Sequence, residues 1–426
     1  MKVFRDPVHG VIDLDTGERD VNDLILKLID SREFQRLHYI KQLGFVYFAY
    51  PSAMHTRFEH SIGVACLAKR FVEKLISIEE RVLSTRPKSE HGLLCDFFEE
   101  IKSNRCMVIV ASLLHDIGHG PLSHVFEEIT GIRHESWTEN IIMGNTEINS
   151  LLSAFDTSYP SKICRLLTSP VKSSPMTQII AWQLDIDRID YLLRDSYMSG
   201  SGYGRFDVEW LFNVLTVGIS DGKAMIGLDL GKGLSVAEDF IMARAYMFKN
   251  VYLHKTALVG YDMLRLLLKR IKNTENPSAF FQNESLRNLA LPEYRTENVS
   301  KRLADYLSVS DVDLYHFLGV LRGSDDEVIS RLAGGLLDRR LFKRIDDSRW
   351  DEVKAAISNE KGTDAAPYYM SKLVTKTEKA SYRPKQDEIL LFGKNGECFS
   401  LHEISDVIKS QMKPEAAQTE SYADWG

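Results

Sequence analysis

The chain has 426 residues, of which 44% are hydrophobic and 27% are charged, and its formal net charge is −7. This composition is typical of a globular protein with a sizeable core, and the length allows one large domain with an appendage or two to three ordinary domains. A net acidic chain is not a general nucleic-acid binder, so an anionic substrate would need a local positive field from metal ions and a few arginines or lysines.

Cysteine usage and hydropathy indicate the compartment. The five cysteines are scattered and no C-x-x-C motif occurs, so we expect free thiols in a reducing environment. The N-terminus carries charges where a signal peptide needs an apolar run, and the longest apolar stretch, 106–114, is about half of a bilayer span. We therefore expect a cytoplasmic protein with no membrane partner.

Most of the chain is predicted to be helical, since apolar residues recur with a period near 3.6 residues over long stretches. The polar run 84–89 predicts a surface loop, and Gly118, Gly120 and Pro121 mark the end of an apolar, buried helix. In chain order, the predicted helices cover residues 21–43 (with a break near 30–31), 60–76, 107–116, 136–143, 178–197, 236–272, 302–321 and 325–339.

Two parts of the chain show strand patterns instead. β-branched residues on both sides of a turn at 220–222 predict a hairpin over 214–230, and two further strands are predicted at 388–392 and 398–401. The predicted fold class is therefore mainly α. We expect a helical core over residues 1–321, a small C-terminal α+β region over 322–412 and a disordered tail over 413–426.

Histidines gather with acidic residues at three places, and acidic residues alone gather at a fourth, 185–195; the strongest pattern is the adjacent His115-Asp116 pair. A buried carboxylate costs several kcal/mol unless it is paired or coordinated, and imidazole with carboxylate suits Mn, Fe, Zn or, through the oxygens, Mg. A bare His-Asp pair is more often an ordinary helix end, but five of the twelve histidines lie at His60 or between His115 and His134. That clustering favours a metal site. The four places are 55–60, 115–124, 134–135 and 185–195.

Asp187, Tyr191 and Asp195 are spaced i, i+4 and i+8, so they share one face of a predicted helix. Such a face can carry a metal ligand at Asp187 and groups that contact substrate one and two turns further on. The alternative is a solvated face with weak ion pairs.

Two arginines occur in similar rows. Arg57 lies three residues before His60, and Arg244, Phe248 and Tyr252 repeat the i, i+4, i+8 spacing. An arginine suits a phosphate because its guanidinium donates two parallel hydrogen bonds, although an isolated arginine is more often part of an ion pair.

Several longer strings occur in one order along the chain, and together they carry a resemblance. The chain resembles the HD-domain metal-dependent phosphohydrolases, in particular the deoxynucleoside triphosphate (dNTP) triphosphohydrolase branch that includes the human SAM-and-HD-domain protein. The resemblance is strong over roughly residues 1–260, and it implies a helical HD-domain core and a compact form without a SAM domain. The strings are 6–10, 34–37, 40–44, 57–63, 115–124 and 187–195.

The resemblance also implies roles for individual residues. The implied metal ligands are His60, His115, Asp116 and Asp187. The residues implied to surround the scissile phosphate are His119, His124 and His134, of which His124 would donate a proton to the leaving 5′-oxygen. The residues implied to contact substrate are Gln42, Leu43, Arg57, Arg188, Tyr191, Asp195, Arg244 and Tyr252.

The implied reaction is attack of a metal-activated water on the α-phosphorus of a dNTP, which yields deoxynucleoside and triphosphate. The cofactor would be a divalent metal ion, with Mg, Mn, Fe, Zn, Ni and Co all open, and the protein would be a homo-oligomer, either a dimer or a tetramer. One alternative is another HD-domain phosphohydrolase: a nucleotidase, a phosphodiesterase or a nuclease. A second alternative is a non-catalytic protein that senses nucleotides or binds nucleic acid.

The chain departs from the best-known member of that branch at several positions. Two of them belong to the nucleotide-activator sites of that member, so activation by a bound nucleotide is left open here, as is the choice between ribose and deoxyribose. The departures are at Arg5, His38, Arg188, Phe248 and Leu253.

Overall fold

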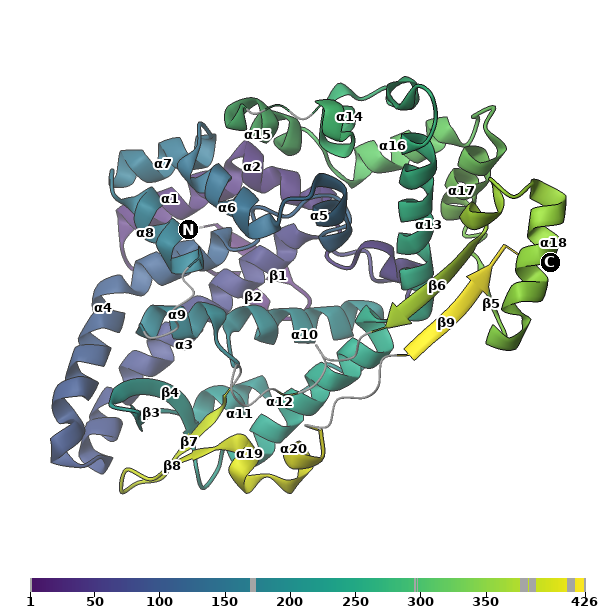
Figure 1. Cartoon of the computed structure of the whole chain (residues 1–426). Helices are drawn as coiled ribbons and strands as arrows, with labels where there is room; N and C mark the ends of the chain where they lie inside the picture. Colours follow the sequence, from purple (N-terminus) through teal and green to yellow (C-terminus); the bar gives the residue numbers. More distant parts are fainter. Residues whose placement is uncertain are drawn as a thin grey trace.

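The computed structural model describes residues 2–168, 174–294, 296, 298–375, 382, 388–411 and 418–424. Over these residues the protein is mainly helical, with three small sheets (Figure 1). The fold class predicted from the sequence is thus confirmed. Within the described part of the chain, we find no helix with the length and apolar character that crossing a membrane requires.

The elements follow one another closely along the chain. The helices up to the first large sheet are α1 (Arg19–Asp30), α2 (Arg32–Gln35), α3 (Arg57–Thr85), α4 (His91–Leu114), α5 (His124–Thr130), α6 (His134–Met143), α7 (Glu147–Phe155), α8 (Tyr159–Thr168), α9 (Pro175–Ala181), α10 (Ile186–Ser199) and α11 (Val208–Asn213). The later helices are α12 (Leu234–Met247), α13 (Lys255–Lys272), α14 (Glu284–Ala290), α15 (Val299–Leu307), α16 (Asp311–Leu321), α17 (Glu327–Leu337), α18 (Trp350–Lys361), α19 (Leu401–Ile404) and α20 (Asp406–Gln411). The strands are β1 (Val3–Asp6), β2 (Gly10–Asp13), β3 (Leu215–Ser220), β4 (Lys223–Asp229), β5 (Lys343–Ile345), β6 (Met370–Thr375), β7 (Leu390–Phe392), β8 (Cys398–Ser400) and β9 (Gln418–Ala423).

Helices α3, α4 and α10 form the centre that positions the site. The long helices α3 and α4 pack along each other, and α10 packs against α3. Helix α3 begins at a capping box in which Thr56 and Glu59 satisfy each other's free backbone N–H groups. Helix α10 begins at Asp185, whose side chain accepts from the N–H of Arg188, and it ends at the left-handed Gly200.

Several stretches predicted as single helices are divided. The stretch 178–197 is split between α9 and α10, and 302–321 is split between α15 and α16, where Ser310 forms a second capping box with Asp313. The stretch 236–272 is interrupted by a π-helical turn over Phe248–Tyr252. Apolar periodicity continues across each break, but side chains that bind backbone N–H groups start a new helix there.

The predicted strands are confirmed, and the C-terminal ones complete a sheet begun in the core. Strands β3 and β4 form the predicted hairpin, and β7 then pairs in parallel with β4 through Leu228 and Leu391. The predicted domain boundary at residue 321 stays a prediction. Helix α17, which begins just beyond it, packs on α13 and α16.

The predicted disordered tail needs a correction over residues 418–423. These residues form β9, the central strand of the sheet β5-β9-β6 (Figure 1). Its small and polar side chains carry little apolar signal, but its backbone pairs with two strands and Arg331 forms an ion pair with Asp424. The rest of the predicted tail, 413–417 and 425–426, lies outside the described residues.

Candidate metal centre and active site

Two histidines and an aspartate from three elements meet in the interior. His60 lies on α3, His115 directly follows α4, and Asp187 lies in the first turn of α10. His60 Nε2 lies 3.0 Å from Asp187 Oδ1 and 3.3 Å from His115 Nε2. The side chain of His60 is fully buried whereas that of Asp187 is 37% exposed, so one side of the cluster is open to solvent. These donor atoms lie close enough together to hold a metal ion.

Asp116, the fourth predicted ligand, lies beside this cluster. Its carboxylate is 3.4 Å from His115 Nε2 and 3.5 Å from His60 Nε2. Arg57 forms an ion pair with the same carboxylate and also donates two hydrogen bonds to Ser123 Oγ, at 2.8 and 3.2 Å. Asp116 therefore lies within reach of the cluster while it is paired with Arg57.

A network of buried charged residues contacts His60 on the ring nitrogen that faces away from the cluster. Two of its members, His9 and Asp190, are not among the site residues predicted from the sequence. Asp190 accepts hydrogen bonds from His60 Nδ1 at 2.8 Å and from His9 Nε2 at 2.5 Å. Arg194 binds both Asp190 and Asp6, which links α10 to the N-terminal hairpin. A carboxylate on the second nitrogen of a ligand histidine fixes the tautomer and the orientation of the ring. The network thus provides the support that a metal-binding histidine needs.

The charges of the cluster favour a bound cation. Burial works to lower the pKa of His60, but Asp187 and Asp190 outweigh it and raise this pKa to about 10. Burial also opposes ionisation of Asp116, yet Arg57 and His115 hold the pKa of its carboxyl well below the usual range. Ionised carboxylates therefore surround imidazoles that carry protons, and a divalent ion can replace these protons. Imidazole with carboxylate fits Mn, Fe, Zn, Ni or Co, and Mg through the oxygens.

A second histidine pair lies next to Asp116. The rings of His119 and His134 stack with their centroids 3.9 Å apart, and His134 Nδ1 donates to Glu127 Oε1 at 2.6 Å. His119 Nε2 lies 3.4 Å from Asp116 Oδ1, and burial together with Arg57 lowers the pKa of His119 well below its ordinary value. The structure thus brings His119 and His134 together near the metal cluster. It adds Glu127, which no spacing in the sequence distinguishes.

Asp195 lies two turns beyond Asp187 on α10 and forms a polar pair with Tyr252. Asp195 accepts hydrogen bonds from His55 Nε2 at 2.7 Å and from the Tyr252 hydroxyl at 2.8 Å. The ring of Tyr191 lies edge-on to that of Tyr252, with 6.0 Å between the centroids. The helix face predicted from the sequence therefore runs from the metal cluster to a buried Asp–Tyr pair, and the π-helical turn after α12 supplies its tyrosine.

The two remaining predicted arginines have different surroundings. Burial raises the pKa of Tyr191, and both Arg244 and Arg188 work against that rise, so both guanidinium groups lie near this tyrosine. Arg244 is buried and lies 5.6 Å from the ring centroid of Phe248. Arg188 donates to groups in the segment just before α10, at 3.0 and 2.5 Å. Arg244 thus packs on Phe248, and Arg188 braces the start of α10.

Gln42 and Leu43, the residues predicted to contact base and sugar, lie on a short segment whose backbone is hydrogen-bonded on both sides. The N–H of Gln42 donates to the carbonyl of His55 at 3.0 Å, and the carbonyl of Leu43 accepts from the Tyr261 hydroxyl at 3.1 Å. Gln42 Oε1 is buried and has no hydrogen-bond partner among the described residues. His124, the predicted proton donor, begins α5, but its side chain lies outside what the structure describes.

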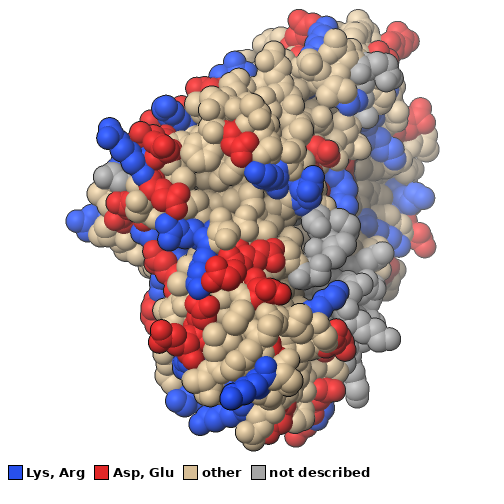
Figure 2. Space-filling view, turned by 90° about the vertical axis from the view of Figure 1, so that its left-hand side faces the viewer, with Lys and Arg blue, Asp and Glu red and all other residues tan. Residues whose placement is uncertain are grey.

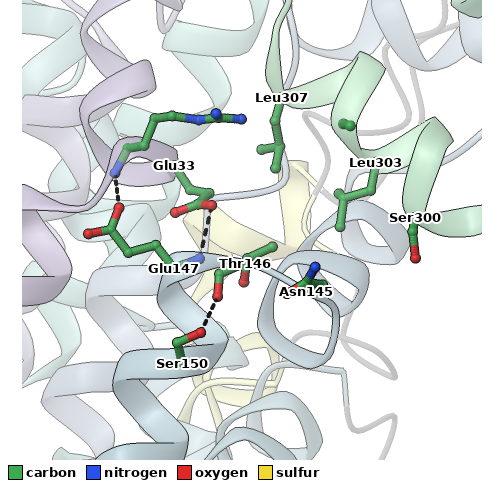
Figure 3. Close-up of a pocket in the computed structure, with 10 residues that line it drawn as sticks. Glu33, Asn145, Thr146, Glu147, Ser150, Ser300, Leu303 and Leu307 are labelled. Carbon is green, nitrogen blue, oxygen red and sulfur yellow. Dashed lines mark hydrogen bonds between the residues drawn. The ribbon is translucent and has the colours of Figure 1, made fainter.

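A separate hollow between α2, α7 and α15 contains none of the predicted site residues (Figure 3). Glu33 accepts from the N–H of Glu147 at 3.2 Å, and Glu147 accepts from the N–H of Arg32 at 2.9 Å. These carboxylates cap the N-termini of two helices, where free N–H groups and the helix dipole attract anions. The capping explains the acidic residues, so the candidate site stays at the histidine cluster.

A comparison with known proteins finds a match over the segment that contains the proposed metal ligands. The family model "HD domain" matches residues 57–195, a range that begins at Arg57 and ends at Asp195. The uncharacterized protein YwfO of Bacillus subtilis is 30% identical over 418 residues, which cover 96% of this chain and 89% of YwfO.

Two further relatives have described activities. The deoxynucleoside triphosphate triphosphohydrolase SAMHD1 of Danio rerio is 27% identical over 414 residues, which cover 89% of this chain and 60% of that protein. The crystal structure of a phosphohydrolase from Bacteroides thetaiotaomicron matches with a TM-score of 0.80 and 27% identity, and the match covers the whole of both chains.

Proposed function

The chain belongs to the HD-domain phosphohydrolases, and from this premise we propose that it hydrolyses dNTPs to deoxynucleoside and triphosphate with a divalent metal ion. One observation carries the proposal: a single face of α10 reaches the metal cluster through Asp187 and the Tyr252 hydroxyl through Asp195. Residues eight positions apart on a helix are about 12 Å apart along its axis, so this face is long enough for a nucleoside and its phosphates to lie along it. The name of the zebrafish relative supports the same substrate class.

His60, His115 and Asp187 would hold the metal, with Asp116 beside them as the fourth ligand. When bound, a divalent ion supplies an activated water and polarises a phosphoryl oxygen. The chain's own contribution is orientation, since Asp190 and His9 hold the ring of His60 in place. Imidazole and carboxylate donors do not select among the candidate metals.

Arg57 and Arg244 would neutralise the charge that develops on the transferring phosphoryl oxygens. Arg57 lies against the metal cluster through Asp116, so an anion bound there meets its guanidinium at once. Phosphate oxygens compete for the same guanidinium, and substrate binding would therefore free Asp116 for the metal.

Protonation of the leaving 5′-oxygen is proposed for His124, and His134 is the second candidate. His119 is a poor acid because burial and Arg57 keep its imidazole neutral. His134 is oriented by Glu127, because its Nδ1 donates to that carboxylate and the contact fixes the orientation of the ring. Replacement of His134 and of His124, each by glutamine, separates the two assignments by the pH dependence of kcat.

The sugar and base would lie between the Asp195–Tyr252 pair and the segment of Gln42 and Leu43. Gln42 Oε1 is buried without a partner in the described part of the chain, so it can accept a hydrogen bond from a nucleoside. Leu43 is 9% exposed and offers an apolar surface. The comparison of each dNTP with the matching ribonucleotide tests whether this surface excludes a ribose 2′-hydroxyl.

One observation favours the alternative of another HD-domain phosphohydrolase. Phe248 packs edge-on against Tyr252, with 5.1 Å between the centroids, and lies below Arg244, so an apolar ring occupies part of the region proposed for triphosphate. Nucleic acid is a poor candidate for the substrate, since Lys and Arg are interspersed with Asp and Glu on the face shown in Figure 2. A nucleotidase or phosphodiesterase acting on a small substrate is therefore the competing proposal.

Product analysis tests the proposal. The metal-loaded protein is incubated with each dNTP and the matching ribonucleotide, with and without GTP, and the products are separated by ion-exchange chromatography. We expect deoxynucleoside and intact triphosphate, and no turnover by the double variant His115→Ala/Asp116→Ala. Monophosphate or diphosphate products would support the competing proposal instead.

Assembly is proposed on the resemblance, and the compartment on the scattered cysteines and the charged N-terminus. We propose a cytoplasmic homo-oligomer, a dimer or a tetramer, as in related HD-domain enzymes. Light scattering coupled to size exclusion measures the mass against the 48.6 kDa of one chain.

A further inference from the structure

One buried carboxylate outside the metal cluster binds two segments of the site at once. Asp311, the first residue of α16, is 2% exposed. Its Oδ2 accepts from the N–H of Lys41 at 2.9 Å, and its Oδ1 accepts from the N–H of Leu122 at 3.0 Å. The ammonium group of Lys41 lies 3.8 Å from the same carboxylate. The segment before Gln42 and the turn before α5 are thus tied to a single side chain.

The turn that Asp311 binds is strained. Leu122 and Ser123 have φ angles of 51° and 53°, in the left-handed region that side chains other than glycine rarely adopt. Two consecutive residues stay in this conformation only where their surroundings hold them, and such strain is common at functional sites. Here the holding contacts are Asp311 on Leu122 and the guanidinium of Arg57 on Ser123 Oγ.

The other segment holds the backbone of Arg57. Lys41 forms a β-bridge with Thr56, and the N–H of Arg57 donates to the carbonyl of Ile40 at 2.9 Å. Asp311 therefore fixes Arg57 twice: at its backbone through Lys41, and at its guanidinium through Leu122 and Ser123. These contacts form a closed ring around the arginine that pairs with Asp116.

Capping of α16 does not explain the contacts of Asp311. That cap is formed by Ser310 and Asp313, whose carboxylate accepts from the Ser310 N–H at 2.8 Å and from its hydroxyl at 2.9 Å. Asp311 instead directs both oxygens away from its own helix, to segments 189 and 270 residues distant in the chain.

We infer that Asp311 is a positioning residue that holds Arg57 and the turn before His124 in the geometry needed for phosphoryl transfer. The inference rests on the proposed function for its catalytic consequence, but its structural part does not. A carboxylate is required because both of its oxygens accept a backbone N–H. An asparagine has one oxygen and one NH2 group, so it can satisfy only one of the two segments.

The test compares Asp311→Asn with Asp313→Asn on the same helix. Misplacement of a catalytic group costs about 100-fold in rate, so we expect kcat of Asp311→Asn to fall by about that factor while the bound metal, measured by elemental analysis, is unchanged. Asp313→Asn weakens the helix cap and the hydrogen bond from Asn283, neither of which touches the segments that Asp311 binds. It should therefore lower Tm by a few degrees and leave kcat as in the wild type.

Amide hydrogen exchange gives a readout that does not need activity. In Asp311→Asn, peptides that cover 40–45 and 119–126 should exchange faster than in the wild type, and in Asp313→Asn they should not. Wild-type kcat together with unchanged exchange in Asp311→Asn overturns the inference. If the wild type hydrolyses no nucleotide, the proposed function fails, and the exchange comparison then decides on Asp311 alone.

Discussion

The residues of the metal cluster carry more negative than positive charge unless protons or a metal ion balance it. Asp116, Asp187 and Asp190 lie within hydrogen-bonding or ion-pairing distance of His60. Their combined field outweighs burial and raises the pKa of His60 to about 10, against an ordinary value of 6.5. In the metal-free protein at neutral pH this imidazole therefore holds a proton, and that proton occupies the position a metal would take.

This charge balance predicts proton release on metal binding. Because the folded pKa of His60 lies above the ordinary value, the ring is protonated at about pH 7.5, and each bound ion should release about one proton. The stability that the protonated ring contributes to the metal-free protein is present below pH 6.5 and is lost as pH rises through about 10. Calorimetric titration with Mn²⁺ or Co²⁺ in buffers of different ionisation enthalpy measures the release.

The matched control is Asp190→Asn, which removes one of the carboxylates that raise the pKa of His60. This variant should bind the metal more weakly and release fewer protons per ion. An enthalpy of binding that is the same in every buffer would show that the metal does not displace this proton.

At the scale of elements, the site depends on how closely α3 and α10 approach. A Cβ atom at Gly63 of α3 would lie 2.1 Å from Asp190 Oδ1 and 2.3 Å from Arg194 Nη2. Only a glycine leaves room for the ion pair on α10 that supports His60. The same position therefore determines both helix packing and the orientation of a proposed metal ligand.

Gly63→Ala should accordingly destabilise the fold and weaken metal binding. Overpacking of this kind costs about 1–3 kcal/mol, which denaturant unfolding measures. Gly319→Ala on α16 is the control, because its Cβ would meet no atom within 4 Å. A helical glycine without steric need destabilises by about 0.5–1 kcal/mol relative to alanine, so the control should be more stable than the wild type. A Gly63→Ala variant with wild-type stability and metal affinity would contradict the packing argument.

Local spacing predicts the parts of the site that lie on one element. The face of Asp187, Tyr191 and Asp195 follows from a helical period, and the hairpin over 214–230 follows from its turn residues; both are present. The breaks inside the predicted helices do not follow from periodicity, because they depend on which side chain captures the first free N–H groups.

Contacts across the whole molecule are what the sequence does not reveal. His9 and Asp190 are 181 residues apart, and Asp311 binds segments that long predicted helices separate from it. The residues of β9 show no strand pattern. The strand forms because its backbone pairs with β5 on one side and β6 on the other. Support for the site therefore comes from residues before and after the ligand-bearing part of the chain. The proposed metal ligands lie on α3, directly after α4 and on α10, in the first half of the chain.

The measurement that tests the central claim most directly is hydrolysis of a dNTP in water enriched in oxygen-18, with mass spectrometry of both products. Attack of water on the α-phosphorus places one solvent oxygen in the triphosphate and none in the deoxynucleoside. We expect that labelling pattern with the metal-loaded protein, and no labelled product with His115→Ala/Asp116→Ala. Label in the deoxynucleoside, or in a released monophosphate or diphosphate, would contradict the account.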